Sequence, residues 1–296
     1  MKENSAHPIR LVADGATVLV DPLGAEPLAW SAAGRSLLWA GDPAFWDRRA
    51  PILFPVVGSS VDGIVRIDGA AYPMPQHGFA KDRLFETVER SAEAVRLRLR
   101  ADETTRRHYP FSFCLDIALA LTPTTFVVTA DVVNEGSEPM PYALGFHPGF
   151  AWPFDAATRD GHHVAFAADE VPEVPGIVPL VGLLERRLRP IPLADRRLDL
   201  SPDLFRGGAL IVRDAASRSL RLMGPSGSTI TIEAEGFRHW AVWTKPDAGF
   251  VCLEALTGHA DWTDADGDIA QRNSILWLAP GDTARHRVTM RFDPAT

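Results

Sequence analysis

The stretch from Phe113 to Val133 decides the fold class. It reads FCLDIALAL over residues 113–121, TPTT over 122–125 and FVVTADVV over 126–133. Both apolar runs have the length of a strand, and the proline in the short segment between them indicates a turn. The sequence therefore predicts an antiparallel β-hairpin over residues 113–133.

The same period-two pattern continues on both sides of this hairpin. Upstream, residues 95–100 alternate strictly between apolar and arginine side chains, which is typical of a strand with one solvent-facing side. Downstream, short apolar runs, several of them separated by turns that contain Gly or Pro, indicate strands over residues 220–223, 228–234, 240–243, 250–256, 275–278 and 286–292. Many short strands at near-regular spacing predict a sandwich or barrel.

The chain has little room for helices. Its 296 residues include 24 prolines and 23 glycines, and no stretch of ten or more residues has a convincing helical period. Neither a GxGxxG turn nor a P-loop is present, so nucleotide-binding βαβ folds are excluded. Residues 155–203, rich in Pro, Arg and Asp, are expected to form long connections and edge strands. With no repeat or linker, we expect residues 1–296 to form one all-β domain, a large antiparallel β-sandwich.

Charge and composition limit the partners. The 30 Lys+Arg and 38 Asp+Glu residues give a formal net charge of −8, and no basic run is present, which argues against nucleic acid and an anionic membrane surface. No apolar stretch approaches a membrane span, and the N-terminus lacks the pattern of a signal peptide. Cys114 and Cys252 lie in apolar runs, as buried thiols do. We expect a cytoplasmic protein with a small neutral ligand.

Three segments place titratable residues in apolar or Gly/Pro-rich surroundings. The first, YPMPQHGFAKD over residues 72–82, holds His77 between prolines and Gly78. The prolines stiffen the loop and the glycine permits close backbone approach, so the imidazole can be held rigidly. A turn histidine that bonds only to the backbone is the alternative.

The second segment is YALGFHPGF over residues 142–150. Pro148 favours an extended backbone at His147, which places the imidazole at the end of a strand, where a site can open. Because aromatic residues surround it, a hydrogen-bonded core histidine is an equally good interpretation.

The third segment, FVCLEAL over residues 250–256, is apolar on both faces of the strand except for Glu254. A carboxylate buried without partners costs several kcal/mol or shifts its pKa upward, and a raised pKa suits a general base or acid near neutral pH. The alternative is a structural salt bridge with one of the many arginines.

The other candidates give weaker signals. His162 and His163 follow each other in a polar segment, and neighbouring side chains on a strand point in opposite directions, so a metal site is not indicated there. No HxxxH, CxxC or GxSxG spacing is present. His239 and His286 lie in strand-like segments and are interpreted as structural. We expect neither a metal nor a cofactor.

Taken together, these motifs resemble those of the aldose 1-epimerase (galactose mutarotase-like) family. They are PILFPVVG at 51–58, DG at 62–63, PQHGFA at 75–80, GFHP at 145–148 and VCLE at 251–254, in the family's order. The resemblance extends from about residue 11 to 292. It implies an antiparallel supersandwich with an open sugar-binding cleft.

The resemblance also implies roles for the three titratable residues. Glu254 matches the family's general base, His147 the general acid at the ring oxygen, and His77 a second histidine beside that oxygen. The base removes the proton of the C1 hydroxyl while the acid protonates O5, and the ring opens. Rotation about C1–C2 and reclosure then exchange the α and β anomers. A carboxylate opposite an imidazolium, both tuned to titrate near pH 7, is the expected arrangement.

Substrate-binding positions depart from the family pattern. Many members carry an arginine after the glycine that corresponds to Gly58, where this chain has Ser59. Gln76 and Ser59 are nevertheless expected to line the sugar site. Lys81 is the nearest candidate cation for a sugar phosphate, and because it stands without the arginine, we expect a neutral aldose.

A second departure lies before residues 209–212. Members often have an acidic residue there, and this chain has Gly207 and Gly208 instead, so Asp203 is the candidate substitute in substrate binding. Ala255 takes the place of a proline that we would expect after the glutamate. These changes leave the identity of the sugar open.

Two other functions compete with a mutarotase of neutral sugars. One is a non-catalytic carbohydrate-binding or sensing protein on the same fold, and the other is a hexose-6-phosphate mutarotase. Glycoside hydrolysis usually requires two carboxylates, and only one well-placed candidate is present. The expected partner is a small-molecule sugar, and a monomer or homodimer is expected.

Overall fold

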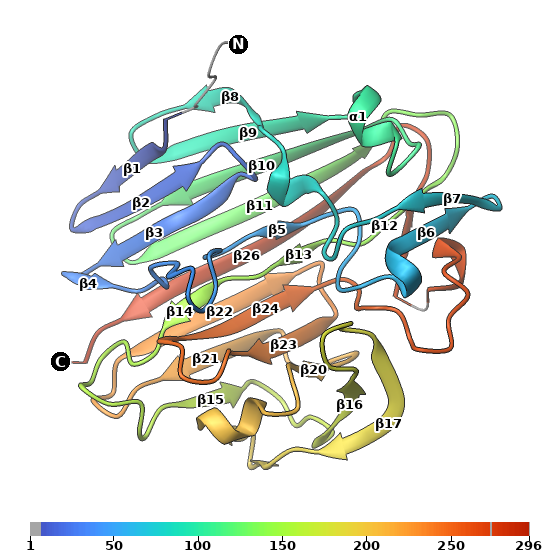
Figure 1. Ribbon diagram of the computed structural model, residues 1–296. Coiled ribbons are helices and arrows are strands. Elements are labelled where there is room, and N and C mark those ends of the chain that lie inside the picture. The colour runs from blue at the N-terminus through green and yellow to red at the C-terminus, as the bar shows by residue number, and fades with distance from the viewer. Residues whose placement is uncertain (1–6, 273, 296) are drawn as a thin grey trace.

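The computed structural model describes residues 7–272 and 274–295, and its regular secondary structure consists almost entirely of β-strands (Figure 1). The outermost residues of the expected 1–296 domain, 1–6 and 296, lie outside the described residues. Within these residues the one α-helix is the four-residue α1 (Glu103–Arg106), in agreement with the abundance of breakers. Four short 3-10 turns complete the helical elements: Val61–Gly63, Ala80–Asp82, Pro202–Phe205 and Ile269–Gln271.

The largest sheet has ten strands. In spatial order they are β18 (Leu193–Ala194), β19 (Arg197–Asp199), β15 (His163–Phe166), β21 (Ser219–Met223), β22 (Thr229–Glu235), β26 (Thr283–Asp293), β11 (Thr125–Asn134), β10 (Phe113–Leu121), β9 (Ala94–Arg100) and β8 (Glu86–Arg90).

A six-stranded sheet includes the strand that holds Glu254 and the strands on either side of His147. Its path is β20 (Leu210–Val212), β23 (His239–Trp243), β24 (Phe250–Leu256), β13 (Gly145–Phe146) and β5 (Ile52–Leu53), with β14 (Gly149–Ala151) also paired to β24.

The remaining strands form a four-stranded sheet and three two-stranded sheets, two of which are hairpins. The four are β1 (Ile9–Ala13), β2 (Ala16–Asp21), β3 (Glu26–Ala32) and β4 (Arg35–Ser36). The pairs are β6 (Ile64–Ile67) with β7 (Ala70–Pro73), β12 (Met140–Tyr142) with β25 (Leu276–Leu278), and β16 (Glu173–Ile177) with β17 (Leu184–Pro190).

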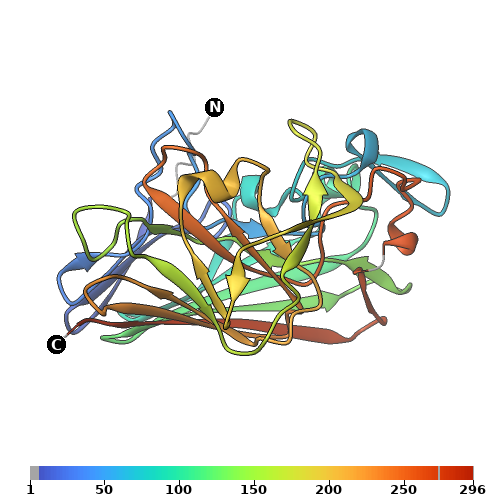
Figure 2. The same cartoon turned by 90° about the horizontal axis from the view of Figure 1, so that it is seen from below.

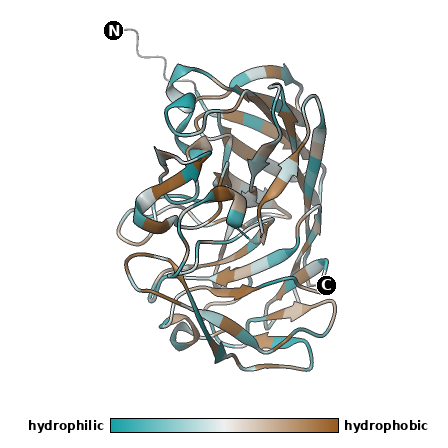
Figure 3. Ribbon diagram, turned by 90° about the vertical axis from the view of Figure 1, so that its right-hand side faces the viewer, coloured by the Kyte–Doolittle hydropathy of each residue, from teal (hydrophilic) through white to brown (hydrophobic). Residues whose placement is uncertain are grey.

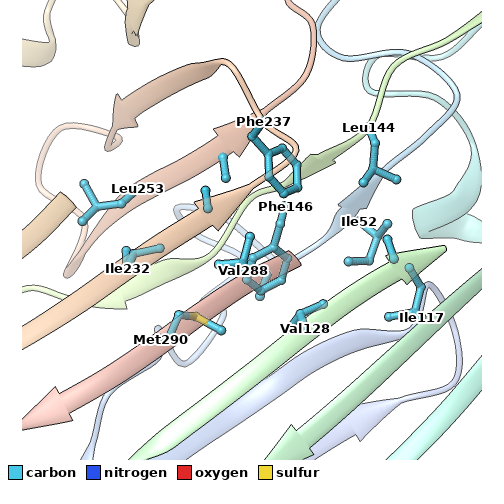
Figure 4. Close-up of a cluster of buried hydrophobic side chains, with 14 of the residues drawn as sticks. Ile52, Ile117, Val128, Leu144, Phe146, Ile232, Phe237, Leu253, Val288 and Met290 are labelled. Carbon is cyan, nitrogen blue, oxygen red and sulfur yellow. The ribbon is translucent and has the colours of Figure 1, made fainter. Parts of the chain in front are cut away.

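The sheets stack around one main hydrophobic core. Figure 2 shows the long strands of the ten-stranded sheet as one layer and the β16–β17 hairpin rising on the opposite side. Ile117, Val128 and Val288 from that layer meet Phe146 and Leu253 from the six-stranded sheet (Figure 4). Apolar burial between the two sheets is therefore the main stabilising interaction of the sandwich.

The large sheet faces solvent on its other side. Along β9 the buried Val95, Leu97 and Leu99 alternate with arginines, and such alternation of hydrophobic and hydrophilic residues is visible along the strands in Figure 3. Arg98 donates two hydrogen bonds of 2.6 Å to the carboxylate of Asp116 on the neighbouring strand. The period-two pattern therefore marks one buried and one charged face.

The predicted all-β antiparallel sandwich is confirmed. The hairpin over residues 113–133 is present, with antiparallel pairing from Phe113 opposite Asn134 to Leu121 opposite Phe126. The downstream strands agree to within a few residues with β21, β22, β23, β24, β25 and β26. Cys114 and Cys252 are free, buried thiols, as expected.

The interpretation of residues 155–203 is partly wrong. β15 is not an edge strand, because it pairs with both β19 and β21 inside the large sheet. Its inward residues, Val164 and Phe166, are too few for alternation to be recognised in a four-residue strand. His162, in the polar segment before β15, is buried, with Nε2 3.1 Å from Oδ1 of Asp155.

The two strand histidines do have structural partners. His286 contacts the Tyr142 hydroxyl through Nε2 at 2.9 Å and the Gly236 carbonyl oxygen through Nδ1 at 2.8 Å. Nδ1 of His239 accepts a hydrogen bond from the Asp214 N–H. No helix in the described part of the chain has the length and apolarity that a membrane crossing requires.

Candidate active site

A cavity of about 580 Å³ opens on the face of the six-stranded sheet that points away from the main core. Successive side chains of β24 point alternately into the core and toward the cavity. Val251, Leu253 and Ala255 enter the core, whereas Glu254 and Leu256 line the cavity. The single charged residue of this apolar strand therefore lies at a cavity wall.

Glu254 is held in surroundings that oppose its charge. Its side chain is buried, and its Oε1 lies 3.3 Å from Nε2 of His147, the one His, Lys or Arg side chain with a nitrogen within 4 Å among the described residues. Burial raises the pKa of Glu254 from its ordinary 4.5 to about 8. In the sugar-free cavity this carboxyl group therefore keeps its proton at neutral pH.

His147 lies between β13 and β14, where the chain leaves one strand and enters the next. Its backbone N–H donates to the Pro51 carbonyl at 3.2 Å, which ties this corner to the segment preceding β5. Burial, and then the neighbouring His77, lower the pKa of His147 well below the usual value. The imidazole is therefore neutral at pH 7, in contrast to the imidazolium expected from the sequence.

His77 is fixed by a reciprocal pair of hydrogen bonds with Gly58. Its backbone N–H donates to the Gly58 carbonyl at 2.9 Å, and its Nδ1 accepts from the Gly58 N–H at 3.1 Å. Because Nδ1 is the acceptor, the neutral ring carries its proton on Nε2. Burial, and then the charge of Lys81, lower the pKa of His77 to about 4, so this neutral form prevails.

The residue after His77 must be glycine. Gly78 has a φ of +72°, and a Cβ there would lie 2.1 Å from the Phe54 carbonyl oxygen. His77 itself has a φ of +65°, which is uncommon for a residue with a side chain. The loop thus reaches a conformation that ordinary residues avoid, and packing against the segment after β5 maintains it.

The three titratable residues selected from the sequence line the same cavity. The rings of His77 and His147 are 5.7 Å apart between centroids, and Glu254 contacts His147. His77 also has the backbone contacts of a turn histidine, but its ring lines the cavity as well. Glu254 and His147 can share one proton across 3.3 Å, and His77 adds an N–H donor, so the cavity combines an acid–base pair with a hydrogen-bond donor.

The four candidate sugar-binding residues separate into two groups. Gln76 and Lys81 line the cavity. Ser59 is outside the lining and buried beside Gly182, where a Cβ on the glycine would lie 2.9 Å from the Ser59 hydroxyl. Asp203 is exposed and paired with Arg206 at 2.7 Å, also outside the lining, because the 3-10 turn that carries it points its carboxylate to solvent.

Arg48 lines the cavity and was not identified from the sequence. It lies in the loop between β4 and β5, and Glu26, a buried carboxylate on β3, fixes it. One oxygen of Glu26 lies 3.2 Å from the guanidinium, and the other accepts from the N–H of Arg49 and of Ala50. No local pattern reveals such a residue, since its position depends on a strand more than 20 residues away.

Two tryptophans form a further wall that the sequence alone did not indicate. The Trp46 ring lies 5.0 Å from the His147 ring at 32°, and Trp243 stands edge-on to both, at 5.5 Å from Trp46 and 5.7 Å from His147. Both indoles are half-buried and line the cavity. Aromatic faces of this kind suit the apolar face of a sugar ring.

The cations at the cavity are matched by carboxylates. Lys81 lies 2.6 Å from Asp82, and Arg48 contacts both Asp82 and Glu26. Two positive and two negative groups therefore leave this corner without net charge. In residues 7–272 and 274–295, no three or more His, Cys, Asp or Glu side chains are grouped so as to hold a metal ion.

Comparison with known proteins gives a consistent result. The family model described as aldose 1-epimerase matches residues 8–291. Protein LacX, chromosomal, from Lactococcus lactis subsp. lactis is 27% identical over 268 residues, which cover 85% of this chain and 88% of that protein.

Solved structures agree with this match. A galactose mutarotase related enzyme from Lactobacillus acidophilus has a TM-score of 0.90 at 26% identity, over 98% of each chain. A galactose mutarotase-like protein from Lactobacillus casei ATCC 334 has a TM-score of 0.89 at 27% identity, over 97% of this chain and all of that chain. The protein thus has a galactose mutarotase-like fold and belongs to the aldose 1-epimerase family.

Proposed function

We propose that the protein interconverts the α and β anomers of a neutral aldose by opening and reclosing the sugar ring. The observation that carries this proposal is the convergence of Glu254, His147 and His77 on one cavity. The family match and the two mutarotase-like structures support the same class of reaction.

In the proposed reaction, the proton of the Glu254 carboxyl group first passes across 3.3 Å to His147, which gives a carboxylate and an imidazolium. The carboxylate then takes the proton of the C1 hydroxyl. The C1–O5 bond breaks, C1 becomes the aldehyde carbon, and O5 receives a proton from His147. Rotation about C1–C2 and the reverse steps give the other anomer. Because Glu254 gains the proton that His147 loses, the pair keeps its proton count, and their separation of 3.3 Å permits the proton to return directly.

His77 supplies a hydrogen bond beside the ring oxygen. With Nδ1 occupied by the Gly58 N–H, its Nε2–H is the group left to donate into the cavity. Such a donor is stronger toward an oxygen that gains negative charge than toward the ether oxygen of the closed ring. His77 therefore favours the transition state over the bound sugar.

Ion pairing at the cavity supports a neutral sugar over a sugar phosphate. Arg48 and Lys81 are the two cations of the lining, and Glu26 and Asp82 already neutralise them. A phosphate group would have to compete with both carboxylates for these cations.

Polarimetry tests the proposal. Freshly dissolved α-D-glucose and α-D-galactose are followed with wild-type protein, with Glu254→Gln and with Glu233→Gln, whose carboxylate is exposed on β22. We expect acceleration over buffer by the wild type and by Glu233→Gln, and its loss in Glu254→Gln. If neither these sugars nor a wider panel of aldoses is interconverted faster than in buffer, the proposal is wrong, and tight binding without turnover would indicate a sugar-binding protein.

A further inference from the structure

The two sides of the cavity differ in polarity. The strand order defines these two sides. β13 and β5 lie on one side of β24, and β23 and the edge strand β20 lie on the other. The side toward β13 and β5 carries the two histidines, Gln76 and the paired cations, and we call it the polar side. The side toward β20 is lined by Ile177, Gly208, Ala209, Ile211 and Ala241, and we call it the apolar side.

Strand register places the apolar side relative to the catalytic carboxyl group. Glu254 pairs with Ala241 on β23, and Ala241 pairs with Ile211 on β20, so the three side chains share one face in a row. Two strand spacings place Ile211 about 10 Å across the sheet from Glu254. A pyranose ring fits between them.

Part of the backbone of the apolar side is already hydrogen-bonded. β20 is paired with β23, and Nη2 of Arg189 donates to the carbonyl oxygens of residues 207, 208 and 209 at 3.2–3.4 Å. Arg189 itself is not part of the lining. A sugar hydroxyl placed against these side chains would lose hydrogen bonds to water and contact carbon atoms instead.

The proposed reaction determines which edge of the sugar ring faces the apolar side. C1 lies at Glu254, and O5 faces the histidines on the polar side. C3 is opposite O5 in a pyranose, so the edge formed by C2 and C3 points toward β20. From this we infer that the preferred substrate is an aldose whose C2–C3 edge is less polar than that of glucose. A sugar that lacks a hydroxyl on this edge, or carries an O-alkyl group there, has this property. The inference rests on the proposed function.

Three related sugars test the preference. Mutarotation of D-glucose, 3-deoxy-D-glucose and 3-O-methyl-D-glucose is measured with the wild type. A buried, unpaired hydroxyl reduces kcat/KM by about 10- to 100-fold, so we expect both modified sugars to exceed glucose by about that ratio. Equal kcat/KM values, or a preference for glucose, would overturn the inference and leave the proposed function intact.

Two variants at residue 211 test whether the apolar side produces the preference for the modified sugars. Ile211→Asn adds a hydrogen-bonding amide and should reduce the ratio toward one, whereas Ile211→Leu keeps an apolar side chain of the same volume and should retain it. Ala209→Ser, on the half-buried neighbour, replaces the asparagine variant if that protein does not fold. An unchanged ratio in both polar variants would contradict the assignment.

A binding measurement distinguishes failure of the inference about substrate preference from failure of the proposed function. If no aldose is interconverted, the proposed function fails, and titration calorimetry with glucose and 3-O-methyl-D-glucose then decides the inference. Tighter binding of the methylated sugar to the wild type, lost in Ile211→Asn, supports it. Equal affinity, or tighter binding of glucose, overturns it.

Discussion

Replacing Glu254 with glutamine should stabilise the folded protein, and the gain should increase with pH. The ordinary pKa of glutamic acid is 4.5, and burial raises that of Glu254 to about 8 in the fold. Between these values the unfolded chain releases a proton that the folded chain retains. Rising pH therefore favours unfolding of the wild type over this window.

The size of the effect follows from the same two values. At about 1.4 kcal/mol for each pH unit, ionisation of this one group destabilises the wild type by about 1 kcal/mol at pH 5 and by about 5 kcal/mol at pH 9. Glutamine has nearly the same shape and does not titrate. The stability of Glu254→Gln relative to the wild type should therefore increase by about 4 kcal/mol from pH 5 to pH 9.

Urea unfolding at pH 5, 7 and 9, followed by tryptophan fluorescence, measures this difference. Glu233→Gln, which removes an exposed carboxylate from β22, provides the control and should differ from the wild type by a few tenths of a kcal/mol at each pH. A difference between Glu254→Gln and the wild type that does not change with pH would refute the claim that burial holds the proton on Glu254.

Three further results are expected. In pH–rate measurements, log kcat/KM should fall as the pH rises above the pKa of Glu254, about 8, because the pair of Glu254 and His147 then lacks the proton that His147 donates to O5. Gly78→Ala should cost more than about 2 kcal/mol in thermal or urea unfolding and reduce activity, since its Cβ meets a backbone carbonyl, whereas Gly69→Ala, with a φ of +79° and open space, should cost about 1 kcal/mol. Trp46→Leu should raise KM more than it lowers kcat, and sugar binding to the wild type should change fluorescence in a way that this variant lacks.

The strands that alternation located are those whose pattern is long enough to be distinctive. β9 and β11 each provide seven or more residues with one face in the core, so their period of two is unmistakable, and β10 is a nine-residue run that is apolar except for Asp116. β15 has only four residues, and two inward side chains do not distinguish it from a connection. β23 and β25 are also short, but their residues are almost all apolar, so strand length and apolar composition together determined which elements were predictable.

The site was predictable where one residue contradicted its surroundings. Glu254 in an apolar strand is such a residue, and the structure shows the consequence in its burial and its raised pKa. Arg48 and Trp46 gave no such signal, because their loop is positioned by Glu26 through tertiary contacts. Asp203 was chosen by its distance along the chain from a strand, and sequence distance does not specify which way a 3-10 turn directs its side chain.

The central claim is that this cavity interconverts anomers through Glu254. Exchange spectroscopy by proton NMR on an equilibrated aldose in D₂O, at a pH near 8, measures the rate between the α and β C1–H signals directly. We predict cross peaks with wild-type protein, none above buffer with Glu254→Gln, and no deuterium at carbon, because the proposed steps break no C–H bond. Wild-type exchange no faster than buffer across a panel of aldoses, or equal exchange with Glu254→Gln, would contradict the account.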